Sequence, residues 1–469
     1  MKRLLFSLIV LSWAITALGQ TFVQVSKTNP HYFATSGGKT YLPIGLNLCW
    51  PRFIDNEAEG LAKMDFYFRR LSENGGNYAR IWLSAPFWEI ETQKAGQFDE
   101  QKRKRFDQLL SLAQRYGIRL KICLENFRKL TNAPAMFPGS VPFDRPIYAS
   151  ANGGPLADMN QYLTSEAGRQ LYLKRAKKLA ERYANHPAIF GWELWNEMNA
   201  VSGKGWEDWT KIMLGELQAL FPNHLIMQSL GSYDRESQRA MYQQITALPN
   251  NDVAQVHRYL DTGASWKIGQ APMDTLASQA TEELLRFRTG KPVLLAEVGA
   301  VEANHAGPWA LYPRDTLGTL LHDILFAPFF TGAAGPGHCW HWDSYVEKND
   351  LWWHFGRFTE AIRDFDPVRE EAVPFTTSLP DGLRLYGLRG KKQTILWIRD
   401  GQSNWQTELV QGKQARTVTN VALPARQFPA NRIDIYNPWN NRHVATKVSG
   451  KQIKLPNFTR SIIVKLYTD

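Results

Sequence analysis

Two glutamates in this 469-residue chain each close a run of apolar residues that would form a buried strand. Glu197 ends the stretch Ala188-Ile-Phe-Gly-Trp-Glu-Leu-Trp-Asn-Glu197, and Glu297 ends Lys291-Pro-Val-Leu-Leu-Ala-Glu297. Apolar runs of this kind are typical of parallel sheets, which are buried on both faces. A pair of carboxylates at strand ends could hydrolyse a glycosidic bond, because one can protonate the leaving oxygen while the other attacks the sugar carbon.

A regular alternation of strands and helices would position these two residues. Helical patterns lie between the predicted strands, and the alternation extends over about 330 residues. This rhythm predicts an α/β fold of the (β/α)₈ TIM-barrel type. A doubly wound open sheet is the alternative, but no glycine-rich phosphate turn follows the first strand. The predicted strands cover residues 41–47, 77–84, 119–124, 188–195, 224–229, 253–257, 293–296 and 332–340.

Two long connections interrupt the rhythm, and a change of pattern follows it. Residues 127–163 and 336–350 lie where strands end, and loops of this length usually shape a site. After Asp366-Pro367 the helical periodicity disappears and short β-rich runs alternate with turn signals. This predicts a small antiparallel β-sandwich. We therefore expect a barrel over residues 20–372 and a second domain over residues 373–469.

The first residues have the pattern of a secretory signal peptide. Met1-Lys2-Arg3 is basic, residues 4–18 are largely apolar, and small residues precede Gln20. The apolar run is somewhat short for a membrane span, which needs about 20 residues. We expect residues 1–19 to be removed and the rest to be exported, to the periplasm or the medium, without a membrane anchor. An uncleaved anchor is the alternative.

Charge and cysteine content exclude several other classes. The formal net charge of +11 falls to +9 without Lys2 and Arg3, and the basic residues are spread along the chain. The densest basic run, Lys102-Arg-Lys-Arg105, lies on a predicted helix and is interpreted as a solvated face, so no nucleic-acid partner is expected. An acidic glycan stays open. The three cysteines have no zinc-ligand spacing, and a bridge between Cys49 and Cys339 requires the first and last strands to be neighbours.

The run Trp192-Glu-Leu-Trp-Asn-Glu197 resembles the acid/base motif of clan A glycoside hydrolases, especially family 5. The resemblance extends over about residues 22–366. It implies that Glu197 is the acid/base, that Glu297 is the nucleophile and that the attacked sugar is β-linked. It also implies that Asn196 binds the sugar 2-hydroxyl, and that neither a metal nor an organic cofactor is needed.

Further positions match the same family pattern. Arg80, in the second strand, would lie near Glu297 and lower its pKa, and a structural ion pair with Glu193 is compatible with that role. His257 and Tyr259 resemble the family's His-x-Tyr pair, in which the tyrosine bonds the nucleophile.

At the end of the eighth strand, Trp340 or Trp342 would form the aromatic floor beneath the sugar, and Trp340 is preferred. The chain departs from the commonest pattern at the third strand. Glu125 stands where many relatives carry a histidine or another polar group, and it would bind substrate hydroxyls or compete electrostatically with the catalytic pair.

Other residues at the predicted rim are candidates for sugar contacts. Asn47, Trp50, Trp82 and Trp88 lie at or just after the ends of the first two strands. Aromatic rings stack on the apolar faces of sugars, although each tryptophan could equally belong to the core. In the second domain, Trp397, Trp405 and Trp439 form either a glycan-binding face or a contact with the barrel.

The sequence therefore predicts an exported, retaining glycoside hydrolase acting on an oligo- or polysaccharide. A non-catalytic glycan-binding protein on the same scaffold and a transglycosylase are the alternatives. The sugar, the linkage and the choice between exo and endo cleavage stay open at this point.

Overall fold

Parallel strands form the wall of a barrel in the computed structural model, which describes residues 21–132, 145–303, 305–446, 448–449 and 451–468. The strands pair in two parallel ladders, ordered β4-β5-β6-β7-β8 and β9-β10. Almost every residue in these strands is buried, as expected for a sheet surrounded by helices. The barrel strands are β4 (Gly45–Asn47), β5 (Tyr78–Trp82), β6 (Arg119–Asn126), β7 (Ile189–Asn196), β8 (Leu225–Met227), β9 (Ala254–Asp261) and β10 (Val293–Val301).

The predicted eighth strand closes the barrel without forming a regular ladder. Cys339 makes an isolated parallel bridge to Val298 of β10, and the backbone N–H of Asn47 in β4 donates to the Cys339 carbonyl at 3.0 Å. Pro336 lacks an N–H group, which prevents continuous pairing in this segment. The segment nevertheless joins β10 to β4, so the (β/α)₈ prediction is confirmed.

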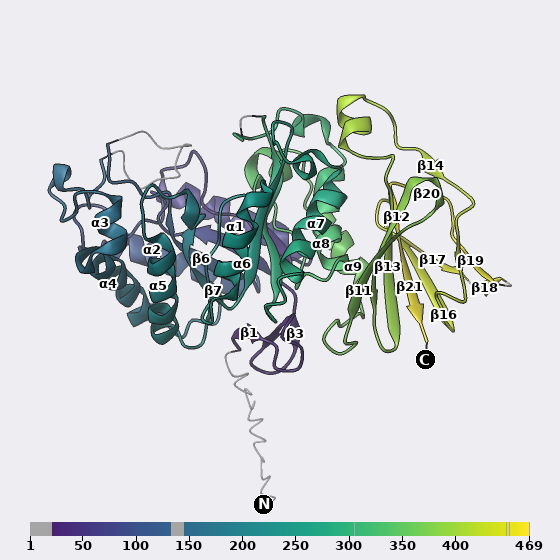
Figure 1. Cartoon of the computed structure of the whole chain (residues 1–469), viewed down its shortest axis with the longest axis horizontal. Coiled ribbons are helices and arrows are strands. Elements are labelled where there is room, and N and C mark those ends of the chain that lie inside the picture. The colour runs from purple at the N-terminus through teal and green to yellow at the C-terminus, as the bar shows by residue number, and fades with distance from the viewer. Residues whose placement is uncertain (1–20, 133–144, 304, 447, 450, 469) are drawn as a thin grey trace, which may run out of the picture.

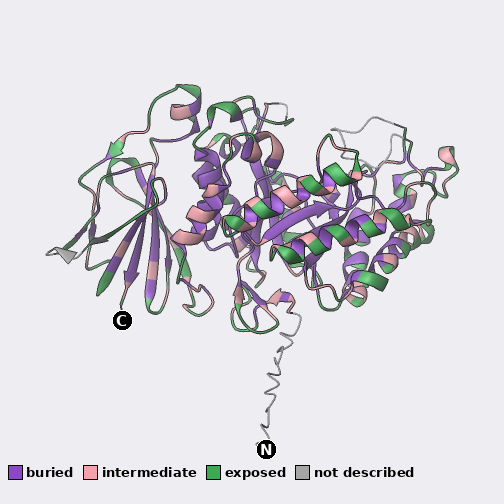
Figure 2. Cartoon of the chain, turned by 180° about the vertical axis from the view of Figure 1, so that it is seen from behind, coloured by how far each residue is buried: buried purple, intermediate pink, exposed green. Residues whose placement is uncertain are grey.

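Helices cover the outside of the barrel, with buried stripes facing the strands and exposed stripes facing water (Figure 2). Polar caps start several of them: Asn56 accepts from Glu59 N–H at α1, and Asp99 accepts from Gln101 N–H at α2. The helices are α1 (Glu57–Glu73), α2 (Glu100–Arg115), α3 (Met159–Thr164), α4 (Glu166–Tyr183), α5 (Trp206–Leu220), α6 (Arg239–Ala247), α7 (Met273–Leu285), α8 (Thr319–Phe330) and α9 (Trp353–Ala361).

The basic run on α2 is only partly solvated, which corrects the expectation of a fully solvated face. Arg103 pairs with Glu100 at 2.8 Å, and Arg105 pairs with Glu57 at 2.7 Å. Both arginine side chains are only 8% exposed. Two of the four cations in this run are therefore neutralised inside the fold.

A small antiparallel sheet closes the end of the barrel opposite the strand ends. It consists of β1 (Val23–Val25), β2 (Phe33–Thr35) and β3 (Thr40–Tyr41), and it lies below the barrel in Figure 1. Phe33 packs edge-on against Phe190 of β7, with ring centroids 5.1 Å apart. The expected signal peptide lies outside the described residues and stays a prediction. Within the described residues, no helix has the length and apolar character needed to cross a membrane.

The C-terminal strands build a six-stranded antiparallel sheet in the order β11-β12-β13-β21-β16-β17. One face packs on the barrel, and the other is covered by two smaller sheets, β14-β20 and β15-β19-β18. Alternating residues such as Leu396 and Trp397 enter the two different cores. The strands are β11 (Val373–Ser378), β12 (Leu383–Arg389), β13 (Gln393–Asp400), β14 (Thr417–Val418), β15 (Ala422–Pro424), β16 (Arg432–Asn437), β17 (Arg442–Thr446), β18 (Val448–Ser449), β19 (Gln452–Lys454), β20 (Phe458–Thr459) and β21 (Ser461–Tyr467).

The tryptophans of the second domain contact the barrel rather than forming a separate face. The ring centroids of Trp397 and Trp439 lie 5.8 and 4.5 Å from that of His322 on α8. Trp405 donates its indole N–H to the Ala271 carbonyl at 3.0 Å. These rings therefore belong to the contact between the two domains.

Buried ion pairs reinforce this contact. Arg399 of β13 binds both carboxylate oxygens of Asp323 on α8, at 2.7 and 3.1 Å. Arg384 of β12 binds Asp274 of α7 in the same two-pronged way, at 2.6 and 2.8 Å. Paired donors of this kind fix orientation as well as distance.

All three cysteines are buried free thiols. Burial raises the pKa of the Cys339 thiol to about 12. The cysteines therefore act as small apolar residues in the barrel core, and the bridge between Cys49 and Cys339 is not formed.

Candidate active site

A bulge in β10 places Glu297 beside β9. Leu295 lies opposite Val256 and Glu297 lies opposite His257, so Ala296 is the extra residue between them. Bulges change the direction of the side chains that follow them and are common next to active sites. Here the bulge brings a carboxylate oxygen of Glu297 to 3.7 Å from the Nδ1 atom of His257.

Glu197 follows β7 directly and has a left-handed backbone conformation, with φ 52° and ψ 56°. Its backbone N–H donates to the Ser229 hydroxyl at 3.1 Å, and the N–H of Met198 donates to the Ser229 carbonyl at 3.2 Å. A glutamate in this conformation costs about 1–3 kcal/mol, and such strain is concentrated at functional sites. The end of β8 thus holds Glu197 in an unusual but fixed orientation.

The two carboxylates converge over the barrel. An oxygen of Glu197, an oxygen of Glu297 and a ring nitrogen of His257 all lie within 4.8 Å of one another. His257 Nδ1 is 2.8 Å from Glu197 Oε1. The two glutamates therefore approach each other closely enough to act on the same bond.

Arg80 connects Glu297 to the barrel interior. Its guanidinium donates to Glu297 Oε2 at 2.5 Å and to both oxygens of Glu193 at 2.8 and 3.1 Å. It also donates to the side-chain oxygens of Asn196 at 2.7 Å and Asn47 at 3.2 Å. Because the amide oxygen of Asn196 already accepts from Arg80, its NH₂ group is the part that can donate a hydrogen bond to a ligand.

Burial and nearby charges act differently on the pKa values of Glu197 and Glu297. Burial, followed by the nearby Glu297 carboxylate, raises the pKa of Glu197 well above its ordinary value. Burial also raises the pKa of Glu297, but Arg80 and the Tyr259 hydroxyl oppose that rise. Burial, Arg80 and Lys121 lower the pKa of His257 far enough to keep its ring neutral. These effects favour a proton on Glu197 and a negative charge on Glu297.

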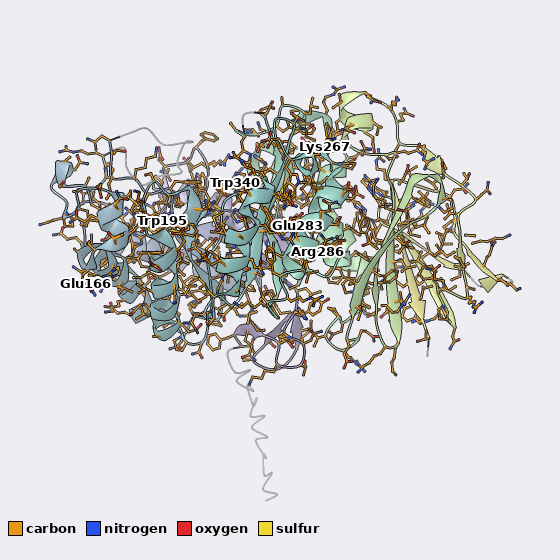
Figure 3. The ribbon with its side chains drawn as sticks, viewed as in Figure 1. Glu166, Trp195, Lys267, Glu283, Arg286 and Trp340 are labelled. Atoms are coloured by element: carbon orange, nitrogen blue, oxygen red, sulfur yellow. The ribbon has the colours of Figure 1, made fainter. Side chains whose placement is uncertain are left out.

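A cavity of about 220 Å³ is lined by both glutamates and by Asn196 and Tyr259. Trp82, Phe127 and Trp340 form its aromatic wall, with the ring centroids of Trp82 and Trp340 4.8 Å apart. Figure 3 shows Trp340 toward the top of the barrel, away from the β1–β3 sheet. Aromatic surfaces with a few convergent polar groups are suited to binding a sugar ring.

Three tryptophans expected at the substrate do not line this cavity, which corrects those assignments. Trp50 is 2% exposed and stacks behind Trp82, with ring centroids 5.3 Å apart. Trp342 is fully buried, whereas Trp340 is 7% exposed and lines the cavity. Trp88 is also fully buried and donates its indole N–H to the Cys49 carbonyl at 3.1 Å. Trp50 and Trp342 lie behind the cavity-lining rings of Trp82 and Trp340, with ring centroids 5.3 Å apart in each pair, and Trp88 packs edge-on against Phe87.

Asn47 and Glu125 are likewise buried residues outside the cavity wall. The Asn47 amide donates to the His338 carbonyl at 3.1 Å, in the segment that closes the barrel. Glu125 accepts from Arg128 at 2.8 Å and lies 3.6 Å from Arg175. Neither side chain is placed to contact a sugar directly, so both act within the protein.

Seven cavity-lining residues were not among the sequence candidates, and four of them carry an aromatic or charged side chain: Arg52, Phe127, His305 and His341. Phe127 directly follows β6, so an aromatic residue just after a strand end was a usable signal. The other three lie on loops, where the sequence pattern gives no orientation. The Nδ1 atom of His341 and the Tyr312 hydroxyl share a hydrogen bond at 2.8 Å.

Replacing Tyr259 with phenylalanine tests its hydrogen bond to Glu297. Its hydroxyl donates to Glu297 Oε1 at 2.5 Å, and this contact lowers the pKa of Glu297. We expect Tyr259→Phe to reduce kcat by about 10- to 100-fold. Without the bond the Glu297 pKa rises, so the acid limb of the pH–rate profile moves to higher pH. Steady-state rates across pH measure both effects.

Tyr67→Phe is the matched control, because Tyr67 is also buried and donates to a carboxylate, that of Glu347, at 2.7 Å. It lies outside the cavity lining. We expect it to lower the melting temperature without moving the pH profile. An unchanged profile in Tyr259→Phe would show that the hydroxyl does not tune Glu297.

The barrel, the converging carboxylates of Glu297 in β10 and of Glu197 just after β7, and the aromatic cavity together define a glycoside hydrolase. Residues 45–316 match the family model described as "Cellulase (glycosyl hydrolase family 5)". The chain therefore belongs to glycosyl hydrolase family 5, and the resemblance seen in the sequence is confirmed.

Curated relatives and solved structures agree with this assignment. The chain is 26% identical over 342 residues to mannan endo-1,4-beta-mannosidase 4 of Solanum lycopersicum, covering 66% of this chain and 80% of that protein. It is 26% identical over 344 residues to mannan endo-1,4-beta-mannosidase 1 of Arabidopsis thaliana, covering 66% and 79%. A family 5 glycoside hydrolase from Bacteroides vulgatus ATCC 8482 has a similar fold, with a TM-score of 0.59, 12% identity and coverage of 95% of this chain and 94% of that one. A further structure named "Glycoside hydrolase" has a TM-score of 0.61 at 11% identity, covering 96% and 97%.

Proposed function

We propose that this protein is a retaining glycoside hydrolase that cleaves β-linked mannosides, with Glu197 as acid/base and Glu297 as nucleophile. The observation that carries the mechanism is the spacing of the two carboxylates, whose oxygens lie within 4.8 Å. Retaining enzymes hold their carboxyl groups about 5–5.5 Å apart, and inverting enzymes leave room for a water at about 6.5–9.5 Å.

In the first step, Glu197 protonates the glycosidic oxygen while a Glu297 oxygen attacks the anomeric carbon. The bond to the leaving sugar breaks, and a glycosyl ester of Glu297 forms. Because its pKa is raised, the Glu197 carboxyl group carries the proton that it donates. Arg80 and Tyr259 keep Glu297 ionised and oriented through their hydrogen bonds. The Asn196 NH₂ group is available to the 2-hydroxyl of the reacting sugar.

In the second step, Glu197 removes a proton from water, which attacks the anomeric carbon and releases Glu297. The two inversions leave the product with the starting configuration. His257 supports both steps because its Nδ1 atom, 2.8 Å from Glu197 Oε1, can bond that carboxyl group in either protonation state. A sugar acceptor in place of water would give transglycosylation through the same intermediate.

The sugar is proposed from the relatives, several of which are named as mannan endo-1,4-beta-mannosidases. Manno-oligosaccharides are therefore the first substrates to test. Export is also part of the proposal, and it is supported by the basic, apolar and small-residue order of residues 1–19.

Proton NMR of the first product tests the mechanism and the sugar together. With mannotetraose we expect the β-anomer to appear first and the α-anomer to follow by mutarotation. Cello- and xylo-oligosaccharides of the same length serve as comparison substrates. An α-anomer appearing first would overturn the retaining mechanism, and cleavage restricted to a comparison sugar would overturn the mannoside assignment.

A further inference from the structure

His341 is a buried residue that lines the cavity of the two glutamates, and it is only 2% exposed. One of its ring nitrogens, Nδ1, shares a hydrogen bond with the Tyr312 hydroxyl at 2.8 Å. The other nitrogen, Nε2, has no hydrogen-bond partner in the described part of the chain. Because buried polar atoms are normally paired, this nitrogen at a cavity wall is a group that a ligand can satisfy.

The Tyr312 hydroxyl determines which ring nitrogen of His341 carries the proton. This hydroxyl accepts the backbone N–H of Ala300 at 2.6 Å, and Tyr312 is 1% exposed. If His341 Nδ1 also donated to the same oxygen, the Tyr312 O–H would be buried without an acceptor among the described residues, which is unfavourable. The hydroxyl therefore donates to Nδ1, and the proton of the neutral ring lies on Nε2.

The surroundings of His341 keep its ring neutral and in place. Burial, followed by the charge of Arg52, lowers the pKa of His341 to about 3. A Cβ atom at Gly299 would lie 2.8 Å from Nδ1, and a Cβ atom at Gly307 would lie 2.7 Å from Nε2. The ring thus fits between two glycines, and Nε2 lies beside Gly307, which also lines the cavity. His341 consequently offers one fixed N–H donor to a ligand.

The ligand within reach of this donor is the sugar that reacts with Glu297. Tyr259 binds Glu297 at 2.5 Å, and its ring centroid lies 6.2 Å from that of His341. The cavity of about 220 Å³ is smaller than the about 300–1,000 Å³ of sites for drug-sized ligands. A sugar at the catalytic pair therefore fills most of the cavity and meets His341.

The order of the barrel strands separates His341 from Asn196. Asn196 ends β7, the fourth strand, whereas His341 follows Cys339 in the closing segment at the eighth position. These positions lie on opposite sides of an eight-stranded barrel. If Asn196 binds the sugar 2-hydroxyl, the group nearest His341 is C5 with its hydroxymethyl group, because C5 lies across the pyranose ring from C2.

We propose that the Nε2–H of His341 donates a hydrogen bond to the 6-hydroxyl of the reacting sugar, and that Tyr312 is a positioning residue for this donor. His341 thereby selects sugars with a hydroxymethyl group at C5 over pentoses and 6-deoxy sugars. The inference rests on the proposed function and names the part of the sugar that is recognised opposite Asn196.

Removing the same contact from the protein and from the substrate tests this proposal. The substrates are an aryl β-mannoside and its 6-deoxy analogue. His341→Phe removes the donor, and His341→Gln keeps an amide donor of similar reach. In the wild type, kcat/KM should be about tenfold lower for the 6-deoxy analogue. His341→Phe should lose this difference between the substrates, and His341→Gln should retain part of it.

His354→Phe is the matched control, because His354 is also buried and lies outside the cavity lining. Its Nε2 atom bonds the Leu317 carbonyl at 2.9 Å. This variant should lower the melting temperature and keep the tenfold difference between the substrates. The 2-deoxy analogue is the substrate control: its loss of kcat/KM should be equal in the wild type and in His341→Phe, since the 2-hydroxyl belongs to Asn196.

Nitrogen NMR of the histidine rings tests the positioning role of Tyr312. The signals of His341, assigned by their absence in His341→Phe, should show a protonated Nε2 and an unprotonated Nδ1 in the wild type. Tyr312→Phe should populate the other tautomer and reduce the difference between the aryl β-mannoside and its 6-deoxy analogue. A tyrosine that only stabilised the fold would change neither.

A tenfold difference that persists in His341→Phe, or no difference in the wild type, would overturn the contact while leaving the hydrolase standing. A ring proton on Nδ1 in the wild type would also overturn it. Because glucosides carry the same 6-hydroxyl, the comparison runs on aryl β-glucosides if mannosides are not cleaved. Absence of wild-type hydrolysis of both glycosides would instead refute the proposed function, and this inference with it.

Discussion

Replacing Glu297 with alanine is expected to reduce kcat by about 10⁴-fold or more on every substrate of the wild-type protein. The variant has no carboxylate to form the glycosyl ester, and no other described carboxylate lines the cavity except that of Glu197. Arg80 keeps its two-pronged pair with Glu193, at 2.8 and 3.1 Å. The fold should therefore survive, and a thermal melt checks this.

Added azide distinguishes a lost nucleophile from a damaged site. Azide can enter the space of the missing carboxylate and attack the anomeric carbon directly, which gives an inverted α-glycosyl azide. We expect rescue with an activated aryl β-mannoside, followed by NMR of the product. Glu282→Ala, a change on the outer surface of α7, is the control and should keep wild-type activity. Activity that persists in Glu297→Ala without azide would refute its assignment as nucleophile.

Replacing Glu197 with alanine should have an effect that depends on the leaving group. Protonation by a positioned acid contributes about 10²- to 10⁴-fold, and a sugar alcohol needs that proton to depart. A dinitrophenolate needs none. We therefore expect mannotetraose hydrolysis to fall by about 10³-fold, whereas the dinitrophenyl β-mannoside should still release its first equivalent of phenolate in a rapid burst.

The pH dependence provides an independent test of the same residue. Burial and Glu297 raise the pKa of Glu197, so the wild-type rate should fall on the basic side as Glu197 loses its proton. That basic limb should disappear in Glu197→Ala with the dinitrophenyl substrate. Azide should here give a β-glycosyl azide with retained configuration, because Glu297 still forms the intermediate. An inverted azide product would mean that the two roles are exchanged.

Much of this site could be predicted from the sequence because its residues lie at the ends of recognisable strands. Glu197 and Glu297 close apolar runs, and Arg80 lies within the second strand, so strand periodicity alone places them at one rim. The contacts of Arg80 with Glu193 and Glu297 follow from the closure of the barrel, in which inward-facing residues of neighbouring strands meet.

The residues that the sequence misplaced show the limit of such patterns. Trp50 and Trp88 lie beyond strand ends and Trp82 is the last residue of β5, yet only Trp82 lines the cavity. Glu125 is the second-last residue of β6 and, like the catalytic glutamates, follows an apolar run, but it forms ion pairs with Arg128 and Arg175. Whether a residue at a rim faces the cavity or the core depends on neighbours that are distant in the sequence.

The sequence by itself determined the barrel, the two glutamates and the change to a β-rich second domain, because hydrophobic periodicity and strand ends are local properties of the chain. Only the tertiary structure decided which aromatic rings reach the cavity and how the bulge at Ala296 turns Glu297 toward His257. Those features arise from packing between segments far apart in the chain, and packing has no signature in the local order of residues.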